Sequence, residues 1–270
     1  MCWLEIALLS ERRNKMAFLR SLLGNIWTYG VIAFGVLFAS VLGWFLPQKF
    51  HIYWWNHLML PAVVWGLRVF GGLKVEFRGL ENLNNKAVYA CKHESAWETY
   101  VLTTVLDKAT MILKKELTYI PFFGWAAALY GLIAVDRSAG ASAMKKMLNE
   151  AKKSVDKGHP IVIFPEGHRV PAGTCLKYKP GFLFLAQNLN MPIVPVALNS
   201  GMFWPRSSFS HISGKIIVEF LPAMQPHGDK NEFIAELQKR IEDKCTELNA
   251  EAMRDYPACK VNFAGKKNEN

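Results

Sequence analysis

The stretch Ile161-Val162-Ile163-Phe164-Pro165-Glu166-Gly167-His168-Arg169 joins a short apolar run to a charged turn. An apolar run of this length that ends at a proline is typical of a buried strand. Glycine lets the backbone approach a ligand closely, and the planar guanidinium of Arg169 suits phosphate oxygens. We therefore predict a strand over Ile161–Phe164 that ends at an anion site. An ion pair between Arg169 and Glu166 would account for the same residues.

A second segment, Gly131–Ser138, has the same design, because an apolar run brings Asp136 and Arg137 to its end. Arg137 is a second candidate for binding an anion, for the same chemical reason as Arg169. Pairing of Arg137 with the neighbouring Asp136 is the alternative. Neither segment is specific when it is taken alone.

Further apolar runs alternate with helical patterns, which is typical of an α/β domain. The expected strands are Ala87–Cys91, Thr110–Leu113, Leu132–Val135, Ile161–Phe164, Ile193–Leu198 and Lys215–Phe220. Helical spacing of apolar residues predicts one helix around 144–155, which stops near Gly158, and another over 233–248. We predict an α/β domain over residues 71–256, a mixed sheet flanked by helices, followed by a flexible tail over 257–270.

His93 and Glu98 lie five residues apart in the segment Cys91–Thr99. An imidazole titrates near neutrality and can take a proton from a hydroxyl, and a nearby carboxylate fixes its tautomer and stabilises the imidazolium. The spacing predicts a catalytic dyad. Ser95 and Glu98 also form a capping box, in which a helix begins at Ser95 and Glu98 reaches back to its N–H. The two interpretations are compatible, since a carboxylate in the first helical turn can point back toward His93.

Leu22–Leu46 is a run of 25 residues without a charged side chain, which is long enough to cross a bilayer core as a helix. The residues Arg12, Arg13, Lys15 and Arg20 precede it. Because cytoplasmic flanks are enriched in basic residues, this asymmetry predicts a cytoplasmic N-terminus. Met16 offers an alternative start of the chain.

A single crossing would leave the remainder of the chain on the opposite side of the membrane. His51–Leu67 resolves this conflict, because it lacks Lys, Arg, Asp and Glu and can return to the first face after a bend at Pro47. We therefore predict a two-helix membrane hairpin within residues 1–70, either spanning or re-entrant, and a protein on the cytoplasmic face of the cell membrane. Two buried helices of a soluble core are the alternative.

The 270 residues carry a formal net charge of +10, and 51% of them are hydrophobic. The positive charge favours anionic lipid headgroups, phosphate substrates or an acidic carrier protein as partners. Nucleic acid is the competing partner of a basic chain, but the sequence has no nucleic-acid-binding motif and its long apolar segment favours lipid. We expect membrane lipids as partners and no nucleic acid.

The cysteines are odd in number, five, and form no Cys-x-x-Cys pair. This pattern favours free thiols and argues against a zinc site or a disulfide scaffold. The seven histidines show no metal-binding spacing, so we expect no metal and no resident cofactor. A thiol nucleophile at Cys91, two residues before His93, is one interpretation, and a small buried strand residue is the other.

These segments, in this order, resemble the glycerolipid acyltransferase family, most closely the bacterial 1-acyl-sn-glycerol-3-phosphate acyltransferases. The resemblance rests on His93–Glu98, Lys114–Leu117, Ile120–Trp125, Gly131–Ser138, Phe164–Arg169 and Val194–Asn199. Ordered blocks of this kind are more specific than a single motif. Two positions depart from the family pattern: Glu98 stands where aspartate is usual, and His168 stands where threonine or serine is usual.

The resemblance implies transfer of an acyl group from acyl-CoA or acyl carrier protein, as co-substrate, to the sn-2 hydroxyl of lysophosphatidic acid, which gives phosphatidic acid. The implied catalytic residues are His93 as general base and Glu98 as the group that orients it. The implied acceptor-binding residues are Arg137, Glu166, Gly167 and Arg169, with the two arginines on the phosphate. Weaker candidates for the phosphate are Lys114, Lys115, Lys177 and Lys179, which a solvated charge run would also explain.

Two alternatives stand beside this function. An acyltransferase of the same superfamily would act on another acceptor, such as a lyso-ornithine lipid, a lysophospholipid or a lipid A precursor, because no motif encodes the acceptor. A non-catalytic membrane lipid-binding protein would use His93 and Glu98 only as a turn and a helix cap.

Overall fold

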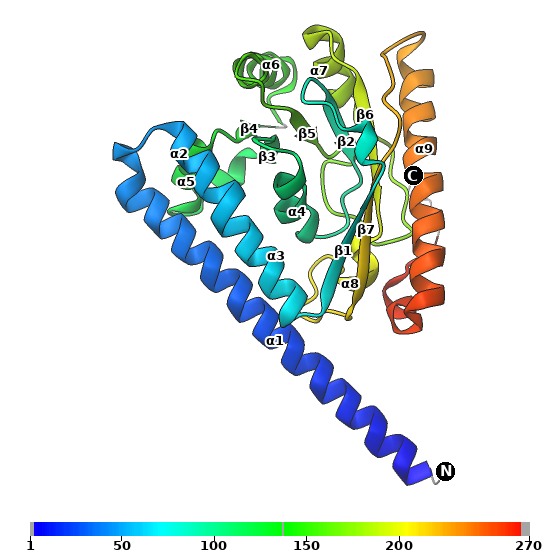
Figure 1. The fold of residues 1–270 in the computed structure, drawn as a ribbon. Helices are drawn as coiled ribbons and strands as arrows, with labels where there is room; N and C mark the ends of the chain where they lie inside the picture. The colour runs from blue at the N-terminus through cyan, green and yellow to red at the C-terminus, as the bar shows by residue number, and fades with distance from the viewer. Residues whose placement is uncertain (1–2, 137, 266–270) are drawn as a thin grey trace.

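The chain is organised around one β-sheet, which lies near the centre of Figure 1. A computed structural model describes residues 3–136 and 138–265, with side chains from Lys15 onward. Within these residues the sheet has seven strands in the order β1-β7-β6-β2-β5-β3-β4. The strands are β1 (Leu73–Arg78), β2 (Val88–Cys91), β3 (Thr110–Lys114), β4 (Ile133–Val135), β5 (Ile161–Ile163), β6 (Ile193–Leu198) and β7 (Gly214–Phe220). Neighbours are parallel except β6 and β7, which confirms the predicted mixed sheet.

The six strands expected from the sequence correspond to β2 through β7. The first strand, β1, was not predicted. Its apolar residues alternate with Lys74, Glu76 and Arg78, so it lacks the continuous apolar run of the inner strands. Alternation is the signal of a strand with one polar face, and charged side chains are common on the edge strand of a sheet. The position of β1 at the end of the strand order explains this pattern.

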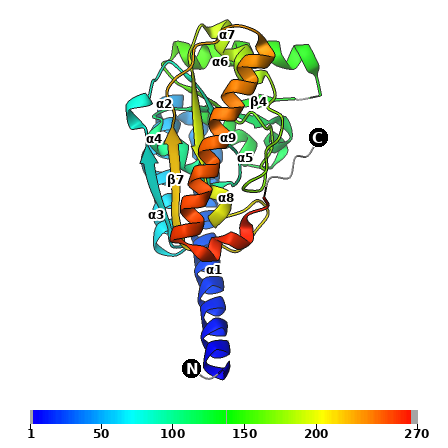
Figure 2. The ribbon, with the colours of Figure 1, turned by 90° about the vertical axis from the view of Figure 1, so that its right-hand side faces the viewer.

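Helices cover both faces of the sheet (Figures 1 and 2). The helices are α1 (Trp3–Leu42), α2 (Gln48–Trp54), α3 (Leu60–Val69), α4 (Trp97–Val105), α5 (Phe123–Tyr130), α6 (Gly140–Asp156), α7 (Gly181–Leu189), α8 (Ser200–Phe203) and α9 (Lys230–Asp255). Helices α3 and α4 contribute to one hydrophobic cluster, whereas α6, α7 and α9 contribute to the other. Strand β2 contributes side chains to both clusters, because successive side chains of a strand point to opposite faces. Tyr89 and Cys91 lie in the first cluster, and Val88 and Ala90 lie in the second.

The two helices predicted from apolar spacing are both present. Helix α6 ends at Asp156, two residues before Gly158. Helix α9 buries the apolar residues that predicted it, which are Phe233, Ile234, Leu237, Ile241, Cys245 and Leu248. These side chains pack in the same cluster as β6 and close one face of the domain.

Helix α1 and the segment α2–α3 form an antiparallel pair, with α3 lying beside α1 in Figure 1. Pro47 lies at the bend, where it precedes the first residue of α2. A π-helical turn over Trp55–Met59 joins α2 to α3, and Pro61, which has no N–H to donate to the preceding turn, directly follows the first residue of α3. Within the described residues, Lys15–Phe45 is the one helical stretch long and apolar enough to cross a membrane.

The segment 257–270 was expected to be a flexible tail, but its described part, 257–265, packs on the domain. Pro257–Asn262 forms a 3₁₀ helix that buries Cys259 completely. Asn262 donates a hydrogen bond to the carbonyl of Met202 at 2.8 Å, and the N–H of Ala264 bonds to the carbonyl of Ala172 at 3.0 Å. These contacts could not be predicted from the polar, lysine-rich composition of the segment 257–270.

Candidate active site

The site lies where parallel strands end side by side. Strand β2 pairs with β5 on one side and with β6 on the other, and all three run in the same direction. Their carboxyl ends therefore share one edge of the sheet, which is where open α/β sheets bind ligands. The segments that follow them bring together His93 after β2, Phe164–Arg169 after β5 and Ser200 after β6.

His93 and Glu98 are in direct contact. The Nδ1 atom of His93 lies 2.8 Å from Oε1 of Glu98. The Glu98 side chain is fully buried, whereas that of His93 keeps 15% of its surface exposed. A carboxylate bonded to Nδ1 favours the tautomer with the proton on that nitrogen, which leaves the lone pair on Nε2. The predicted pair thus has the geometry of an imidazole base oriented by a buried carboxylate.

Glu98 also supports the turn before α4. Its Oε1 accepts hydrogen bonds from the N–H groups of Glu94 and Ser95, at 2.8 and 2.7 Å, and its Oε2 accepts the hydroxyl of Ser200 at 2.8 Å. The helix begins at Trp97 and not at Ser95, because the Ser95 hydroxyl closes a short turn with the N–H of Trp97. Glu98 is therefore both a cap for the turn and the partner of the imidazole.

Phe164 and Glu166 hold His93 from the side of β5. The Phe164 ring stacks on the imidazole with a centroid distance of 3.9 Å and an interplanar angle of 19°. Glu166 is fully buried, and its Oε2 accepts the backbone N–H of His93 at 3.0 Å. Glu166 does not line the cavity described below, and its carboxylate lies against the backbone of His93.

Lys92 is a fully buried cation that ties the site to α9. Its Nζ lies 2.9 Å from Glu166 and 2.7 Å from Glu242 on α9. Burial opposes its charge, but the attraction of the two carboxylates outweighs burial and raises the pKa of Lys92. Burial raises the pKa of Glu166 to about 7, against the opposing attraction of Lys92. A buried ion pair that fixes backbone on both sides makes the loop after β2 rigid.

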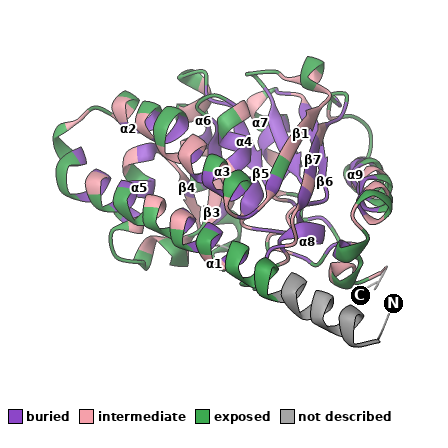
Figure 3. Cartoon of the chain, turned by 60° about the horizontal axis from the view of Figure 1, so that its bottom comes forward, coloured by how far each residue is buried: buried purple, intermediate pink, exposed green. Residues whose placement is uncertain are grey.

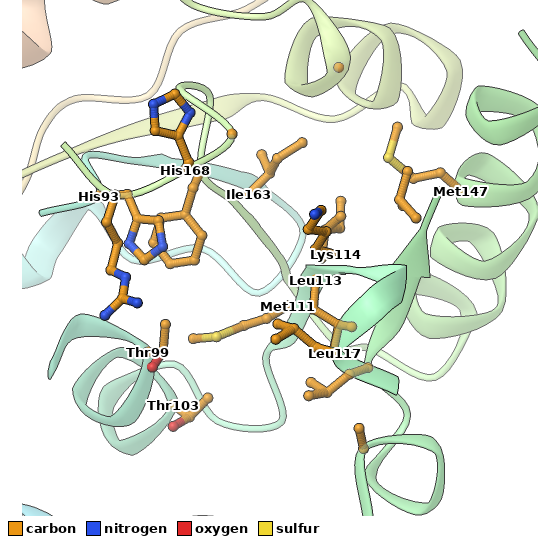
Figure 4. A pocket seen from close by; sticks show the side chains of 18 of the residues that line it. His93, Thr99, Thr103, Met111, Leu113, Lys114, Leu117, Met147, Ile163 and His168 are labelled. Atoms are coloured by element: carbon orange, nitrogen blue, oxygen red, sulfur yellow. The ribbon is translucent and has the colours of Figure 1, made fainter. Parts of the chain in front are cut away.

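A cavity of about 860 Å³ opens beside His93 (Figure 4). Most of its lining is apolar, and in Figure 4 His93 and Met147 lie at opposite sides of it. Apolar lining residues come from α1, α4, β3, α5 and α6, among them Ile32, Val36, Tyr100, Met111, Leu113, Phe123, Ala127, Met144 and Met147. No aspartate or glutamate of the described residues lines it. The cavity suits an apolar chain whose reacting end lies at His93.

Cationic side chains line the cavity as well. They are Lys114, Arg169, Lys179 and Arg206. Of the other sequence candidates, Lys115 pairs with Asp136 at 3.1 Å and does not line the cavity, and neither does Lys177. Arg137 lies outside the described residues.

Gly167 occupies a backbone conformation that only glycine adopts easily. Its φ is +78°, and a Cβ atom there would come within 3.0 Å of the Lys179 ammonium group. Gly167 lines the cavity together with its neighbour His168, which is exposed. The glycine therefore allows the turn after β5 to pass close to the cavity.

Several residues of the site escaped the sequence analysis. Ser200 and Arg206 reach the site from the segment that follows β6. Lys92 pairs with Glu242, which lies 150 residues further along the chain. Lys92 could have been found from its position in the sequence, because a lysine between an apolar strand and His93 must be buried or point into the site. No local pattern marks Ser200 or Arg206.

Cys91 is fully buried in β2, and its thiol donates to the carbonyl of Lys92 at 3.1 Å. Burial raises the pKa of the Cys91 thiol well above its ordinary value, which suppresses the thiolate. These observations favour the buried strand residue over the thiol nucleophile. Among the described residues, no group of three or more His, Cys, Asp and Glu side chains is arranged to hold a metal ion.

Comparisons with known proteins agree with this site. A family model described as Acyltransferase matches residues 74–199. The 1-acyl-sn-glycerol-3-phosphate acyltransferase of Pseudomonas aeruginosa is 36% identical over 84% of this chain and 86% of its own length. The enzyme of the same name from Saccharomyces cerevisiae is 29% identical over 84% of this chain and 75% of its own length.

The crystal structure of the 1-acyl-sn-glycerophosphate acyltransferase from Thermotoga maritima superimposes with a TM-score of 0.65. The match covers 89% of this chain and 98% of that one, at 20% sequence identity, and so supports the fold. The chain belongs to the 1-acyl-sn-glycerol-3-phosphate acyltransferase family.

Proposed function

We propose that the protein transfers an acyl group from a thioester to the sn-2 hydroxyl of 1-acyl-sn-glycerol 3-phosphate and so forms phosphatidic acid. The observation that carries this proposal is the His93 and Glu98 pair at the wall of a large, mostly apolar cavity. The imidazole supplies a base for a hydroxyl, and the cavity has room for an acyl chain. The acceptor follows from the name of the Pseudomonas aeruginosa relative.

In the proposed mechanism, Nε2 of His93 takes the proton of the sn-2 hydroxyl while the hydroxyl oxygen attacks the thioester carbonyl carbon. The tetrahedral intermediate collapses with cleavage of the carbon–sulfur bond, and the imidazolium gives its proton to the departing thiol. The buried charge of Glu98 stabilises the imidazolium between these steps. The mechanism requires no covalent acyl-enzyme.

Arg169 is the proposed ligand of the acceptor phosphate on the side of β5. It lines the cavity and forms no ion pair with a carboxylate of the described residues, so its charge is available to an anion. Gly167 lets the same turn approach the acceptor. Glu166 supports the acceptor site from below by fixing the backbone of His93. Arg137 is proposed for the same phosphate on the sequence alone.

We further propose that residues 1–70 form a membrane hairpin and residues 71–256 the acyltransferase domain on the cytoplasmic face. Helix α1 is long and apolar enough to span a membrane. Large apolar side chains are exposed along it, which two helices of a soluble core would bury (Figure 3). The exposed residues of α1 are Met16, Phe18, Leu19, Leu23, Ile26, Tyr29, Phe34, Leu37, Val41 and Leu42. Leu117, which lines the cavity, and Ile120 and Trp125 are further exposed apolar side chains.

The test is an assay of purified protein with lysophosphatidic acid and, in turn, acyl-CoA and acyl carrier protein as donors. Phosphatidic acid should form with at least one of them. His93→Ala should lower turnover by about a hundred- to ten-thousand-fold while thermal stability is retained, because a general base and little packing is removed. Transfer to another lyso-lipid without any to lysophosphatidic acid would contradict the acceptor, and near-normal turnover of His93→Ala would contradict the mechanism.

A further inference from the structure

The loop between α8 and β7 brings a second arginine to the cavity. Arg206 lies in this loop, outside every pattern that the sequence analysis singled out, and lines the same cavity as His93 and Arg169. Its Nη1 donates a hydrogen bond to the backbone carbonyl of Arg169 at 2.8 Å. Two arginines that are 37 residues apart in the chain are thus joined at one side of the cavity.

No carboxylate of the described residues neutralises either arginine. Among the described residues, no carboxylate lies within ion-pair distance of Arg206 or Arg169. Lys114, at the same cavity, pairs with Glu116 at 3.0 Å. One bond from Nη1 to a carbonyl leaves the other N–H groups of the Arg206 guanidinium for a ligand. Paired, uncompensated guanidinium groups match the charge and geometry of a phosphomonoester dianion.

Helix α1 holds the loop that carries Arg206. The side-chain amide of Asn25 donates to the carbonyl of Phe209 at 2.7 Å. The Ser21 hydroxyl accepts the N–H of His211 at 2.7 Å. Asn25 and Ser21 are both buried, so these bonds are protected from water. The position of Arg206 therefore depends on the helix that we propose to lie in the membrane.

We propose that Arg206 is a specificity-determining residue that binds the phosphate of the acceptor together with Arg169, and that Asn25 and Ser21 of α1 position it. This inference rests on the proposed function, because it assigns the phosphate of that acceptor to a second arginine. Arg206 lies outside the segments that carry the family resemblance, so it adds a contact that the resemblance does not supply.

Arg206→Ala tests the phosphate contact. Its KM for lysophosphatidic acid should rise by about 10- to 100-fold, since a charge-assisted hydrogen bond is lost, while the donor KM stays unchanged. Arg206→Lys should show a smaller rise in this KM, because lysine keeps the positive charge but lacks the planar guanidinium that can form two parallel hydrogen bonds. The control is Arg240→Ala, which removes an exposed arginine that pairs with Glu236 on α9 and should change neither KM. A rise in the donor KM alone, or no rise at all, overturns the assignment.

Equilibrium binding without a donor separates this inference from the proposed function. Wild-type protein and Arg206→Ala are titrated with lysophosphatidic acid and with 1-acylglycerol, which lacks the phosphate. Only lysophosphatidic acid should bind more weakly to Arg206→Ala. Equal losses for both ligands overturn the inference while leaving the proposed function intact. A wild-type protein that neither binds nor acylates lysophosphatidic acid overturns the proposed function itself.

The positioning role of α1 is tested by combining substitutions. Asn25→Ala should raise the acceptor KM in the wild-type background and have no further effect in Arg206→Ala, because both changes act through one contact. A penalty of the same size in both backgrounds contradicts positioning. If thermal unfolding shows that Asn25→Ala is destabilised, Ser21→Ala, which removes only one hydroxyl of the same interface, is measured instead.

Discussion

At the scale of single residues, Glu98 illustrates how one side chain can serve structure and chemistry together. One oxygen accepts from the imidazole of His93 and from two backbone N–H groups, and the other accepts from Ser200. The sequence raised capping and catalysis as two interpretations, and the geometry accommodates both because one carboxylate oxygen contacts the imidazole and the two backbone N–H groups together.

Substitutions at Glu98 separate the two roles. Glu98→Gln keeps an oxygen that can accept from the backbone, but it has no charge to stabilise an imidazolium. It should therefore fold and lose most of the turnover. Glu98→Asp, which has the acid usual in related acyltransferases, should retain substantial activity if the turn absorbs the missing methylene. Turnover and thermal unfolding, both measured in one membrane preparation, distinguish the two roles. A glutamine variant with near-normal turnover would show that Glu98 acts only as a helix cap.

Glu94, next to His93, is a buried acid of a different kind. Its Oε2 accepts the N–H of Gly201 at 2.9 Å, and its Oε1 has no hydrogen-bond partner among the described residues. Burial raises the pKa of Glu94 from 4.5 to about 8, against the opposing attraction of Lys92. At neutral pH the side chain is therefore largely a neutral acid, and it contributes shape and one accepted hydrogen bond but little charge.

The pH dependence of stability tests the state of Glu94. Between about pH 4.5 and 8 the folded protein keeps the proton while the unfolded chain has lost it, so this group makes the fold less stable as the pH rises through that window. Glu94→Gln has no proton to lose. It should match the wild type near pH 5 and exceed it above pH 8 in thermal unfolding. Parallel stability curves for the two proteins across this range would show that Glu94 is ionised in the fold.

At the scale of elements, the pairing of α1 with α3 depends on one close approach. Gly66 of α3 lies under the indole ring of Trp27, where a Cβ atom would overlap the ring. The indole N–H donates to the carbonyl of Ala62 at 2.8 Å, which fixes the ring in place. Trp65 packs on the other side at a centroid distance of 5.2 Å. Glycine therefore sets the distance between these helices.

Gly66→Ala should separate α1 from α3. The added methyl group forces the Trp27 ring or the helix to move, which costs about 1–3 kcal/mol of unfolding free energy, as overpacking does elsewhere. Gly30→Ala on α1 is the matched control, because a Cβ atom there meets nothing within 4 Å and alanine favours a helix. Thermal unfolding in detergent compares the two. Equal stability of both variants would mean that the close approach at Gly66 is not needed.

At the scale of the whole molecule, charge and apolar surface make different contributions to membrane binding. The chain carries a formal net charge of +10, and salt weakens the attraction of such a charge to anionic headgroups. The apolar surface of α1 is insensitive to salt, because its burial in lipid does not depend on charge. These two sources of membrane affinity can therefore be told apart by extraction.

Membranes that contain the protein should keep it through a wash at about 1 M salt, where charges more than about 3 Å apart are screened, and should release it only in detergent. Release of the full chain by salt alone would contradict an inserted hairpin and favour binding by surface charge.

Strands β2 to β7, helices α6 and α9 and the pairing of His93 with Glu98 could be predicted from the sequence. Each of these is encoded over a few neighbouring residues, as an apolar run, a helical spacing or the five-residue separation of His93 and Glu98. The edge strand β1 and the packing of 257–265 could not be predicted, because β1 alternates with charged residues and 257–265 contacts Met202 and Ala172, which are distant in the chain.

Only the tertiary structure decided which side chains meet. Ser200 bonds to Glu98 across 102 residues, Lys92 pairs with Glu242 across 150, and Arg206 reaches the cavity from the loop before β7. Glu166 is buried and accepts the backbone N–H of His93, a contact across 73 residues that no local pattern predicts. Periodicity and capping describe contacts within one or two turns of a chain, whereas these contacts depend on strand order and on the way α9 and α1 pack on the sheet.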